Sequence, residues 1–191
     1  MKKREEETTK IDKKKEQNSV VAEILDYLKT IVIVVVVVLL LNQFVLINAR
    51  IPSESMQNTI MVGDQIFGNR LAYRNSDPER FDIVIFRYPD DPDQLFIKRV
   101  IGLPGETVEI KDGKVYINGS DTPLDDSFCP ETPIGDFGPY EVPEHSYFML
   151  GDNRNWSKDS RFWENTYVHE DAILGKAVLR YWPLNKIGVV E

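Results

Sequence analysis

The segment from Ile31 to Leu41 constrains this chain most, because it consists of eleven consecutive aliphatic residues without a charge. Apolar residues resume from Phe44 to Ile47, after Asn42 and Gln43. The whole stretch, residues 27–48, has about the ~20 residues that a helix needs to cross the hydrocarbon core of a bilayer. A buried core strand runs to roughly 4–8 residues and is too short to explain it. The sequence therefore predicts one transmembrane helix over residues 27–48.

This helix is expected to be a retained anchor. Its apolar stretch is longer than the core of a typical cleaved signal sequence, and no A-x-A cleavage site follows at once. Residues 1–30 contain eight Lys or Arg, whereas Arg50 is the only one in the twenty residues after the span. Cytoplasmic flanks of membrane spans carry the excess of Lys and Arg. We therefore expect a protein of the cell membrane with its N-terminus in the cytoplasm and the residues after the span outside. Residues 1–26 form a charged tail, expected to be disordered over 1–20 and able to touch anionic lipid.

Residues 49–191 are expected to form one extracytoplasmic domain of mainly β structure with few short helices. Runs rich in β-branched and aromatic residues predict antiparallel strands at 65–69, 82–86, 96–101, 107–111, 114–117, 146–150 and 172–181. Asp112-Gly113 predicts a hairpin turn between two of them. Barrel-like closure is the expected architecture. Five prolines within residues 119–143, a segment that also holds Cys129, indicate a loop-like insertion.

Charge and cysteine content exclude several function classes. After the apolar segment the chain carries 15 Lys or Arg against 24 Asp or Glu, so the clustered cations that nucleic acid binding requires are not expected. Cys129 is the only cysteine, which excludes an intramolecular disulfide, and no Cys/His cluster has the spacing of a zinc site. No G-x-S-x-G, H-E-x-x-H, Walker or S-x-x-K motif occurs. Either His145 or His169 could in principle serve a Ser-His-Asp triad, although no known catalytic motif flanks either residue.

Four short segments carry the candidate chemistry. They read IPSESM at 51–56, DIVIF at 82–86, IKRVIGLPGE at 97–106 and GDNRNWSKDSR at 151–161. Each alone has an ordinary interpretation as a turn, a cap or a surface loop. Together, in this order after an anchor, they resemble the type I signal peptidases (leader peptidases), a Ser/Lys dyad family, from the anchor to Gly175. The family's patterns are complete at Lys98–Gly105 and Gly151–Arg161, whereas Glu54 and Asn58 replace its usual Gly and Pro.

A lysine can replace histidine as a base only when it is neutral near the working pH. The pKa of a free lysine is about 10.4. Burial in apolar surroundings disfavours the ammonium form and lowers that pKa, by up to ~3–5 units in full burial. In a strand, Lys98 shares a face with Phe96 and Val100. The sequence therefore offers Lys98 the surroundings that a lysine base needs.

The resemblance implies a role for each matching residue. Ser55 would be the nucleophile and Lys98 its general base, with Ser157 hydrogen-bonding the lysine amine. The Ser53 hydroxyl and the Ser55 N–H would form the oxyanion hole, and Asp159 would pair with Arg161 nearby. Substrates would be preproteins cleaved after small residues, as in Ala-x-Ala, and bound as an added strand. The matching substrate-binding positions, for which ordinary core is the alternative, are Ile51, Pro52, Met56, Ile60, Phe96 and Ile97. No metal or organic cofactor is implied.

Three functions stay open at this point. The first is a membrane-bound serine endopeptidase that removes signal peptides, similar to the compact single-span form common in Gram-positive bacteria. The second is a self-cleaving Ser/Lys protein of the SOS-repressor type, which the membrane span and the acidic domain disfavour. The third is a non-catalytic tethered adaptor or a decayed homologue. The first implies preproteins, membrane lipid and a secretion translocon as partners, and convergence of Ser55, Lys98 and Ser157 would favour it.

Overall fold

The computed structural model describes residues 2–129 and 131–190, with side chains from Glu23 onwards. The chain divides after Gln43 into a helical unit and a β-rich unit. The expected combination of one apolar N-terminal helix with a mainly antiparallel β domain is confirmed. The only other helices among the described residues are two 3-10 turns, η1 (Glu170–Ala172) and η2 (Leu184–Lys186).

The helix α1 runs from Lys2 to Phe44. Its part from Glu23 to Phe44 is long and apolar enough to cross a membrane, and its side chains are exposed throughout. The backbone of residues 2–20 is helical where disorder was expected, because Glu, Lys, Arg and Gln are strong helix formers. The helix ends four residues before the expected boundary at Asn48, because the next residues pair as strand β1 and bury Ile47.

The larger sheet has eight antiparallel strands in the order β1-β2-β10-β3-β4-β8-β9, with β11 on β10. Their bounds are β1 Leu46–Arg50, β2 Gln65–Asn69, β3 Ile83–Tyr88, β4 Asp91–Gly102, β8 Ser146–Leu150, β9 Val168–His169, β10 Ile173–Trp182 and β11 Gly188–Val189. Barrel-like closure was wrong, because the edge strands β1 and β9 do not pair in the described structure. A two-residue edge strand such as β9 offers too few backbone groups to close a sheet.

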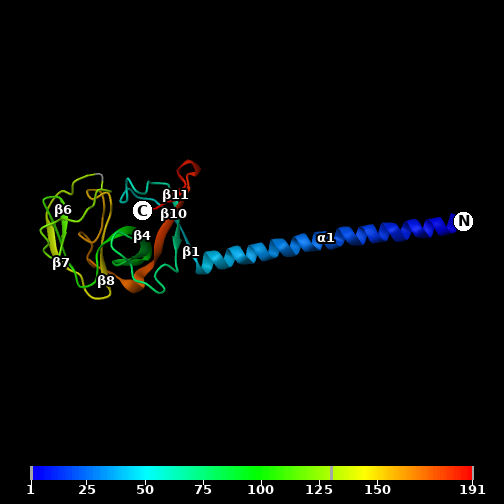
Figure 1. Ribbon diagram of the computed structural model, residues 1–191, viewed down its shortest axis with the longest axis horizontal. Helices are drawn as coiled ribbons and strands as arrows, with labels where there is room; N and C mark the ends of the chain where they lie inside the picture. The colour runs from blue at the N-terminus through cyan, green and yellow to red at the C-terminus, as the bar shows by residue number, and fades with distance from the viewer. Residues whose placement is uncertain (1, 130, 191) are drawn as a thin grey trace. The chain divides into compact units, whose positions relative to one another are not determined.

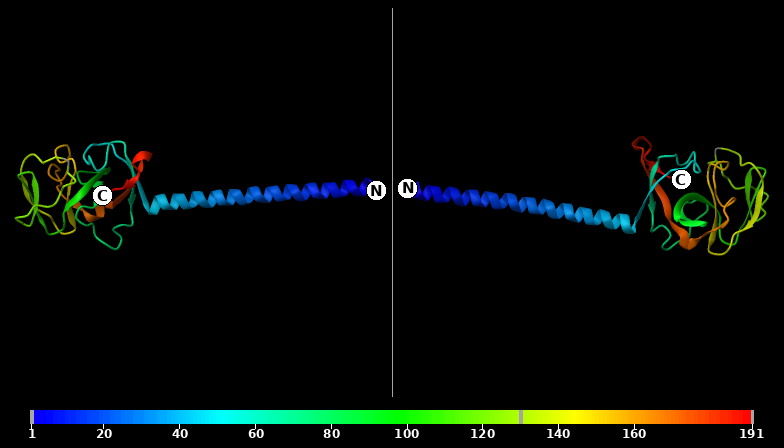
Figure 2. Two further views of the ribbon diagram at one scale, coloured as in Figure 1. Left: turned by 45° about the horizontal axis from the view of Figure 1, so that its top comes forward. Right: turned by 180° about the vertical axis from the view of Figure 1, so that it is seen from behind.

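The smaller sheet has the order β6-β5-β7, with β5 at Thr107–Lys111, β6 at Lys114–Ile117 and β7 at Phe137–Glu141. The predicted hairpin around Asp112-Gly113 is confirmed. Strand β7 lies inside the Pro-rich segment where only loop was expected, and Pro139 is tolerated because β7 is an edge strand. Strands β6 and β7 lie at one end of the β domain and β1, β10 and β11 at the other (Figures 1 and 2).

Alternating side chains of β3 and β4 divide the core into clusters on two faces. Ile83, Ile85 and Ile97 pack with the loop after β1, whereas Val84, Phe86 and Val100 pack with Trp163. The register pairs Val84 with Lys98 and Phe86 with Phe96. Lys98 therefore lies on the face with Phe96 and Val100, as the strand pattern predicted. A third cluster joins the end of β4 to the smaller sheet.

Candidate active site

Lys98 and Ser55 meet in the interior of the β domain, although 43 residues separate them in the chain. Lys98 Nζ lies 2.7 Å from Ser55 Oγ and donates a second hydrogen bond, 3.0 Å long, to its own neighbour's carbonyl at Ile97. Both side chains are buried, with Lys98 at 3% exposure and Ser55 at 6%. A hydroxyl in contact with a water-shielded amine is an arrangement suited to proton transfer.

Strand pairing also brings the fourth candidate segment, residues 151–161, to this contact. Arg99 lies opposite Leu150 in the β4–β8 register, so the loop that begins at Gly151 emerges beside Lys98. Asn153 of that loop donates from its backbone N–H to the Ser55 carbonyl (3.1 Å) and from Nδ2 to the Glu54 carbonyl (3.1 Å). Asn153 therefore fixes the turn that carries the serine. Sequence reasoning missed this role, although the residue lies within one of the matching segments.

The loop between β1 and β2 presents Ser55 from a closed, packed turn. Backbone hydrogen bonds from Ile51 to Asp64 (3.0 Å) and from Gly63 to Ile51 (2.8 Å) tie its two ends together. Met56 and Ile60 are fully buried in the core cluster beneath it. The position of Ser55 is thus held by apolar packing below and by Asn153 from the side.

Burial lowers the pKa of Lys98 to about 8, because desolvation disfavours its ammonium form. The carboxylates of Asp159 and Asp152 act in the opposite direction and raise that pKa. The Phe96 ring adds apolar surface, with its centroid 5.3 Å from Lys98 Nζ. With a pKa of about 8, about a tenth of the lysine would be neutral at pH 7.

The hydrogen bond expected between Ser157 and Lys98 is not made in this structure. Ser157 is buried at 5% exposure, and its Oγ has no hydrogen-bond partner among the described residues. The lysine amine bonds Ser55 and the Ile97 carbonyl instead. A Cβ at Gly151 would lie 2.2 Å from Ser157 Oγ and 2.4 Å from the Ser55 carbonyl oxygen, so only glycine allows these two segments to approach so closely. Ser53 Oγ lies 3.4 Å from Ser55 Oγ. This distance is compatible with the expected contribution of the Ser53 hydroxyl to an oxyanion hole.

Replacing Ser157 with alanine is expected to leave the free energy of unfolding unchanged or raise it by about 1 kcal/mol, because the buried hydroxyl has no partner to lose. Thermal melting of the full chain in detergent measures this, with Ser160→Ala as the matched control. Ser160 Oγ accepts a hydrogen bond from the Met149 N–H, so its removal should lower stability. A clear destabilisation by Ser157→Ala would contradict an unpartnered hydroxyl.

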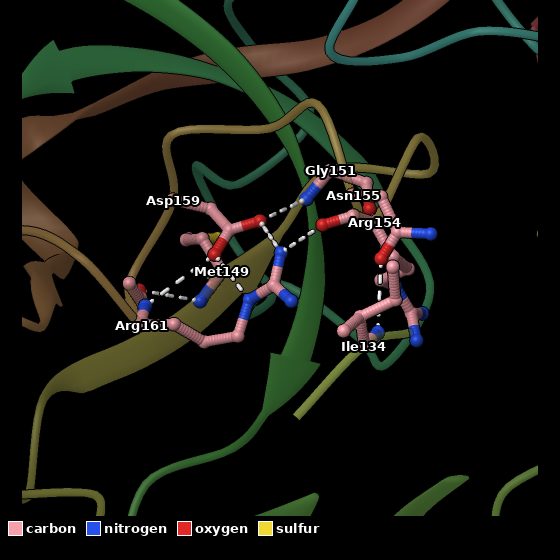
Figure 3. Close-up of polar contacts among 8 residues, drawn as sticks. Ile134, Met149, Gly151, Arg154, Asn155, Asp159 and Arg161 are labelled. Atoms are coloured by element: carbon pink, nitrogen blue, oxygen red, sulfur yellow. Dashed lines mark hydrogen bonds and ion pairs between the residues drawn. The ribbon is translucent and has the colours of Figure 1, made fainter. Parts of the chain in front are cut away.

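Asp159 and Arg161 form a buried, bidentate ion pair in the same loop (Figure 3). Arg161 Nε lies 2.8 Å from Asp159 Oδ1 and Nη2 lies 2.9 Å from Oδ2, while the Gly151 N–H also donates to this carboxylate at 3.1 Å. Arg161 also donates to the Arg154 carbonyl. The pair therefore shapes the loop whose first residue lies beside Lys98.

Two further arginines bind carboxylates that the sequence did not pair with them. Arg99 binds Asp152 through Nε at 2.8 Å and Nη2 at 2.7 Å. Arg154 binds Asp126, a residue of the Pro-rich insertion, at 2.7 Å. Asn155 also accepts a hydrogen bond from the Ile134 N–H of the insertion (Figure 3). Contacts with the insertion thus stabilise the loop at residues 151–161, which in turn contacts the turn that carries Ser55.

Two adjoining pockets open beside Ser55. One, of about 330 Å³, is lined by Ser55 and Lys98 themselves together with Pro52, Ser53, Gln94, Leu95, Phe96, Ile97, Trp156 and Lys158. The other, of about 210 Å³, is lined by Asn48, Ala49, Arg50, Ile51, Pro52, Ile85, Leu95, Phe96 and Ile97. Of the six expected substrate-binding residues, Ile51, Pro52, Phe96 and Ile97 line these pockets. Met56 and Ile60 lie in the core instead, because their turn packs both inward.

The two histidines lie together at the β8–β9 edge, with ring centroids 6.5 Å apart. His145 pairs with Glu170 at 3.1 Å, and both imidazoles are largely exposed. Neither makes a hydrogen bond to a serine in the part of the chain described, which leaves the alternative triad without support. No group of three His, Cys, Asp or Glu residues within 23–129 and 131–190 is placed to hold a metal ion.

Known proteins resemble this chain over most of its length. The family model described as "Signal peptidase, peptidase S26" matches residues 24–182. A signal peptidase I of Leptolyngbya laminosa is 39% identical, over 87% of this chain and 84% of that protein. A probable signal peptidase I-2 of Synechocystis is 37% identical, over 87% and 77%. A signal peptidase I P of Bacillus subtilis subsp. natto is 32% identical, over 87% and 93%.

Proposed function

The chain belongs to the signal peptidase family, peptidase S26, and from that membership we propose a membrane-tethered Ser/Lys mechanism that cleaves after small residues. Membership makes the chain a serine endopeptidase that acts on preproteins carrying signal peptides. The observation that carries the finer proposal is the 2.7 Å contact between Lys98 Nζ and Ser55 Oγ. This contact supports the proposal, because a serine hydroxyl and a lysine amine in a buried site beside a mainly apolar pocket could act as nucleophile and base.

Neutral Lys98 accepts the Ser55 hydroxyl proton while Oγ attacks the carbonyl carbon of the scissile bond. The developing oxyanion accepts hydrogen bonds from the Ser55 N–H and the Ser53 hydroxyl, each of which contributes roughly 3–4 kcal/mol in comparable sites. The lysine ammonium then returns the proton to the leaving amine, and an ester at Ser55 remains. Lys98 next deprotonates a water that attacks this ester, which frees the signal peptide's carboxylate and restores the serine.

The composition of the two pockets supports binding of small apolar side chains upstream of the cut. The two pockets share Pro52, Phe96 and Ile97, so an extended chain that passes Ser55 can place alternate side chains in them. Both linings are mainly apolar, which suits small apolar side chains such as alanine and supports the proposed Ala-x-Ala preference.

The tether would place the nucleophile near its substrate. We take residues 23–44 as the membrane span, with residues 1–22 in the cytoplasm and the β domain outside the cell membrane. Ser55 follows Phe44 by eleven residues, which is at most ~40 Å of extended chain. A membrane-inserted signal peptide presents its cleavage site at the outer surface of the same membrane. The tether therefore raises the effective concentration of Ser55 at the cleavage site. Lipid and a secretion translocon are the partners this geometry implies.

A preprotein with an Ala-x-Ala site tests the specificity. The full chain in lipid vesicles should cut after the second alanine, and Leu in place of that alanine should lower kcat/KM about a hundredfold. Ser55→Ala should remove the cleavage and serves as the control for contaminating peptidases. Cleavage that is indifferent to the size of the residue before the scissile bond would overturn the proposed preference.

The rate should rise with pH through the pKa of Lys98. Since the neutral amine is the base, kcat/KM should increase about tenfold per pH unit below a midpoint of about 8 and level off above it. Initial rates between pH 5.5 and 10 measure this. The His145→Gln/His169→Gln double variant should give the same profile, whereas a midpoint near 6.5 that disappears in that variant would indicate a histidine base.

A further inference from the structure

A third pocket adjoins the pocket of Ser55 and Lys98, and Trp156 lines both of them. This pocket has a volume of about 230 Å³ and is lined by Glu54, Gln57, Asn58, Glu131, Asn153 and Trp156. The three pockets therefore follow one another along the surface, with the reactive serine in the middle one.

Trp156 stands at this junction as an exposed aromatic ring. It is 73% exposed, so its indole contributes little to the core. Its backbone N–H donates to the Asn153 carbonyl at 3.0 Å, and Asn153 in turn holds the serine turn. A large exposed aromatic fixed beside a nucleophile is suited to contact with a polypeptide that lies across it.

The third pocket differs chemically from the other two. Its lining combines two glutamates with three amide side chains and holds no lysine or arginine. Glu131 accepts one hydrogen bond from Asn155 at 3.1 Å, whereas the Glu54 carboxylate makes none within the described structure. The pocket therefore has a negative potential that favours cationic side chains and repels acidic ones.

Chain connectivity indicates which part of a substrate each pocket faces. The apolar pocket is lined by Asn48 to Pro52, which follow the end of α1 at Phe44 within a few residues. The segment of a preprotein before the scissile bond is the one that comes from the membrane and carries small, apolar residues. That segment suits the apolar pocket, so the segment after the scissile bond passes Trp156.

We propose that the pocket of Glu54, Glu131 and Trp156 binds the first residues after the scissile bond and favours basic over acidic side chains there. This inference rests on the proposed function and extends it to the mature part of the substrate. It gives Glu54, where the family usually has glycine, a role in substrate choice. Trp156 provides the contact surface and the two carboxylates provide the charge discrimination.

Matched peptides test the proposal with the full chain in neutral detergent, which removes any contribution from membrane charge. They share one Ala-x-Ala site and carry Lys, Gln or Glu at the two positions after the cut. We expect kcat/KM for the Lys peptide to exceed that for the Glu peptide about tenfold at low salt. The ratio should fall towards one in 1 M salt, where exposed charges are screened.

Variants separate the charge from the surface. The Glu54→Gln/Glu131→Gln double variant should reduce the Lys-to-Glu ratio below about twofold. Glu141→Gln, which removes one carboxylate charge from an exposed position of β7 outside the pocket lining, should leave the ratio at about tenfold. Trp156→Ala should raise KM about fivefold for every peptide with kcat nearly unchanged, and Trp156→Phe should restore KM.

The outcomes distinguish this inference from the function on which it rests. Ser55-dependent cleavage of the Lys and Glu peptides at equal rates would overturn the charged subsite and leave the signal peptidase proposal intact. A tenfold preference that survives in the double glutamine variant would also overturn it. Failure of the wild-type chain to cut any Ala-x-Ala peptide would overturn the proposed specificity itself, and the subsite with it.

Discussion

Replacing Lys98 with methionine is expected to lower kcat/KM for preprotein cleavage by at least about 10⁴-fold. Methionine keeps the length and the apolar stem of the side chain but cannot accept a proton, so Ser55 would lose the base that is proposed to activate it. Ser55→Ala should cost a similar factor, and the double variant should be no worse than either single one, since the two residues act as a unit. Initial rates on an Ala-x-Ala preprotein measure all three.

The same substitution should make the protein more stable, which separates loss of chemistry from loss of fold. The pKa of Lys98 is about 8 in the folded chain against 10.5 unperturbed, so the folded state binds fewer protons between those values. The group therefore destabilises the fold below pH 8, and this cost declines as pH rises towards 10.5. At pH 7 its removal should raise the free energy of unfolding by about 3 kcal/mol. An inactive Lys98→Met variant with a lowered Tm would attribute the loss to misfolding instead.

Much of this site was accessible from the sequence because it rests on local patterns. Alternation of side chains in a strand placed Lys98 on the face of Phe96 and Val100, and the register with β3 confirms it. The predicted strands 65–69, 107–111, 114–117 and 146–150 have the bounds that the structure shows. The family patterns at 98–105 and 151–161 fall on β4 with the turn after it and on the loop after β8.

The features that the sequence did not reveal depend on contacts between distant segments. Nothing local indicates that Asp152 binds Arg99, or that Asp126 in the insertion binds Arg154. Hydrophobicity marks Met56 and Ile60 as apolar but does not say whether they face a pocket or the core. The barrel was expected from strand content alone, whereas closure depends on whether the two edge strands pair.

The Arg99–Asp152 pair should make a large contribution to stability. Asp152 accepts both guanidinium bonds at complete burial, so Asp152→Asn leaves the adjacent Arg99 charge without its neutralising carboxylate. Breaking a buried pair in this way typically costs 3–5 kcal/mol, and a Tm lowered by roughly 10 °C or more is expected in detergent. Glu106→Gln removes a carboxylate from the more exposed Arg80–Glu106 pair and should cost less.

Asp152→Asn should also shift the pH profile of cleavage, which loss of a purely structural contact would not explain. The Asp152 carboxylate raises the pKa of Lys98, so its neutralisation should move the activity midpoint below about 8. The retained Arg99 charge, next to Lys98 in β4, acts in the same direction. Glu106→Gln, outside the site, should leave the midpoint unchanged. A midpoint that stays in place in Asp152→Asn would mean that Asp152 does not influence the pKa of Lys98. A downward shift would show that this ion pair stabilises the fold at the expense of the neutral lysine that the proposed reaction needs.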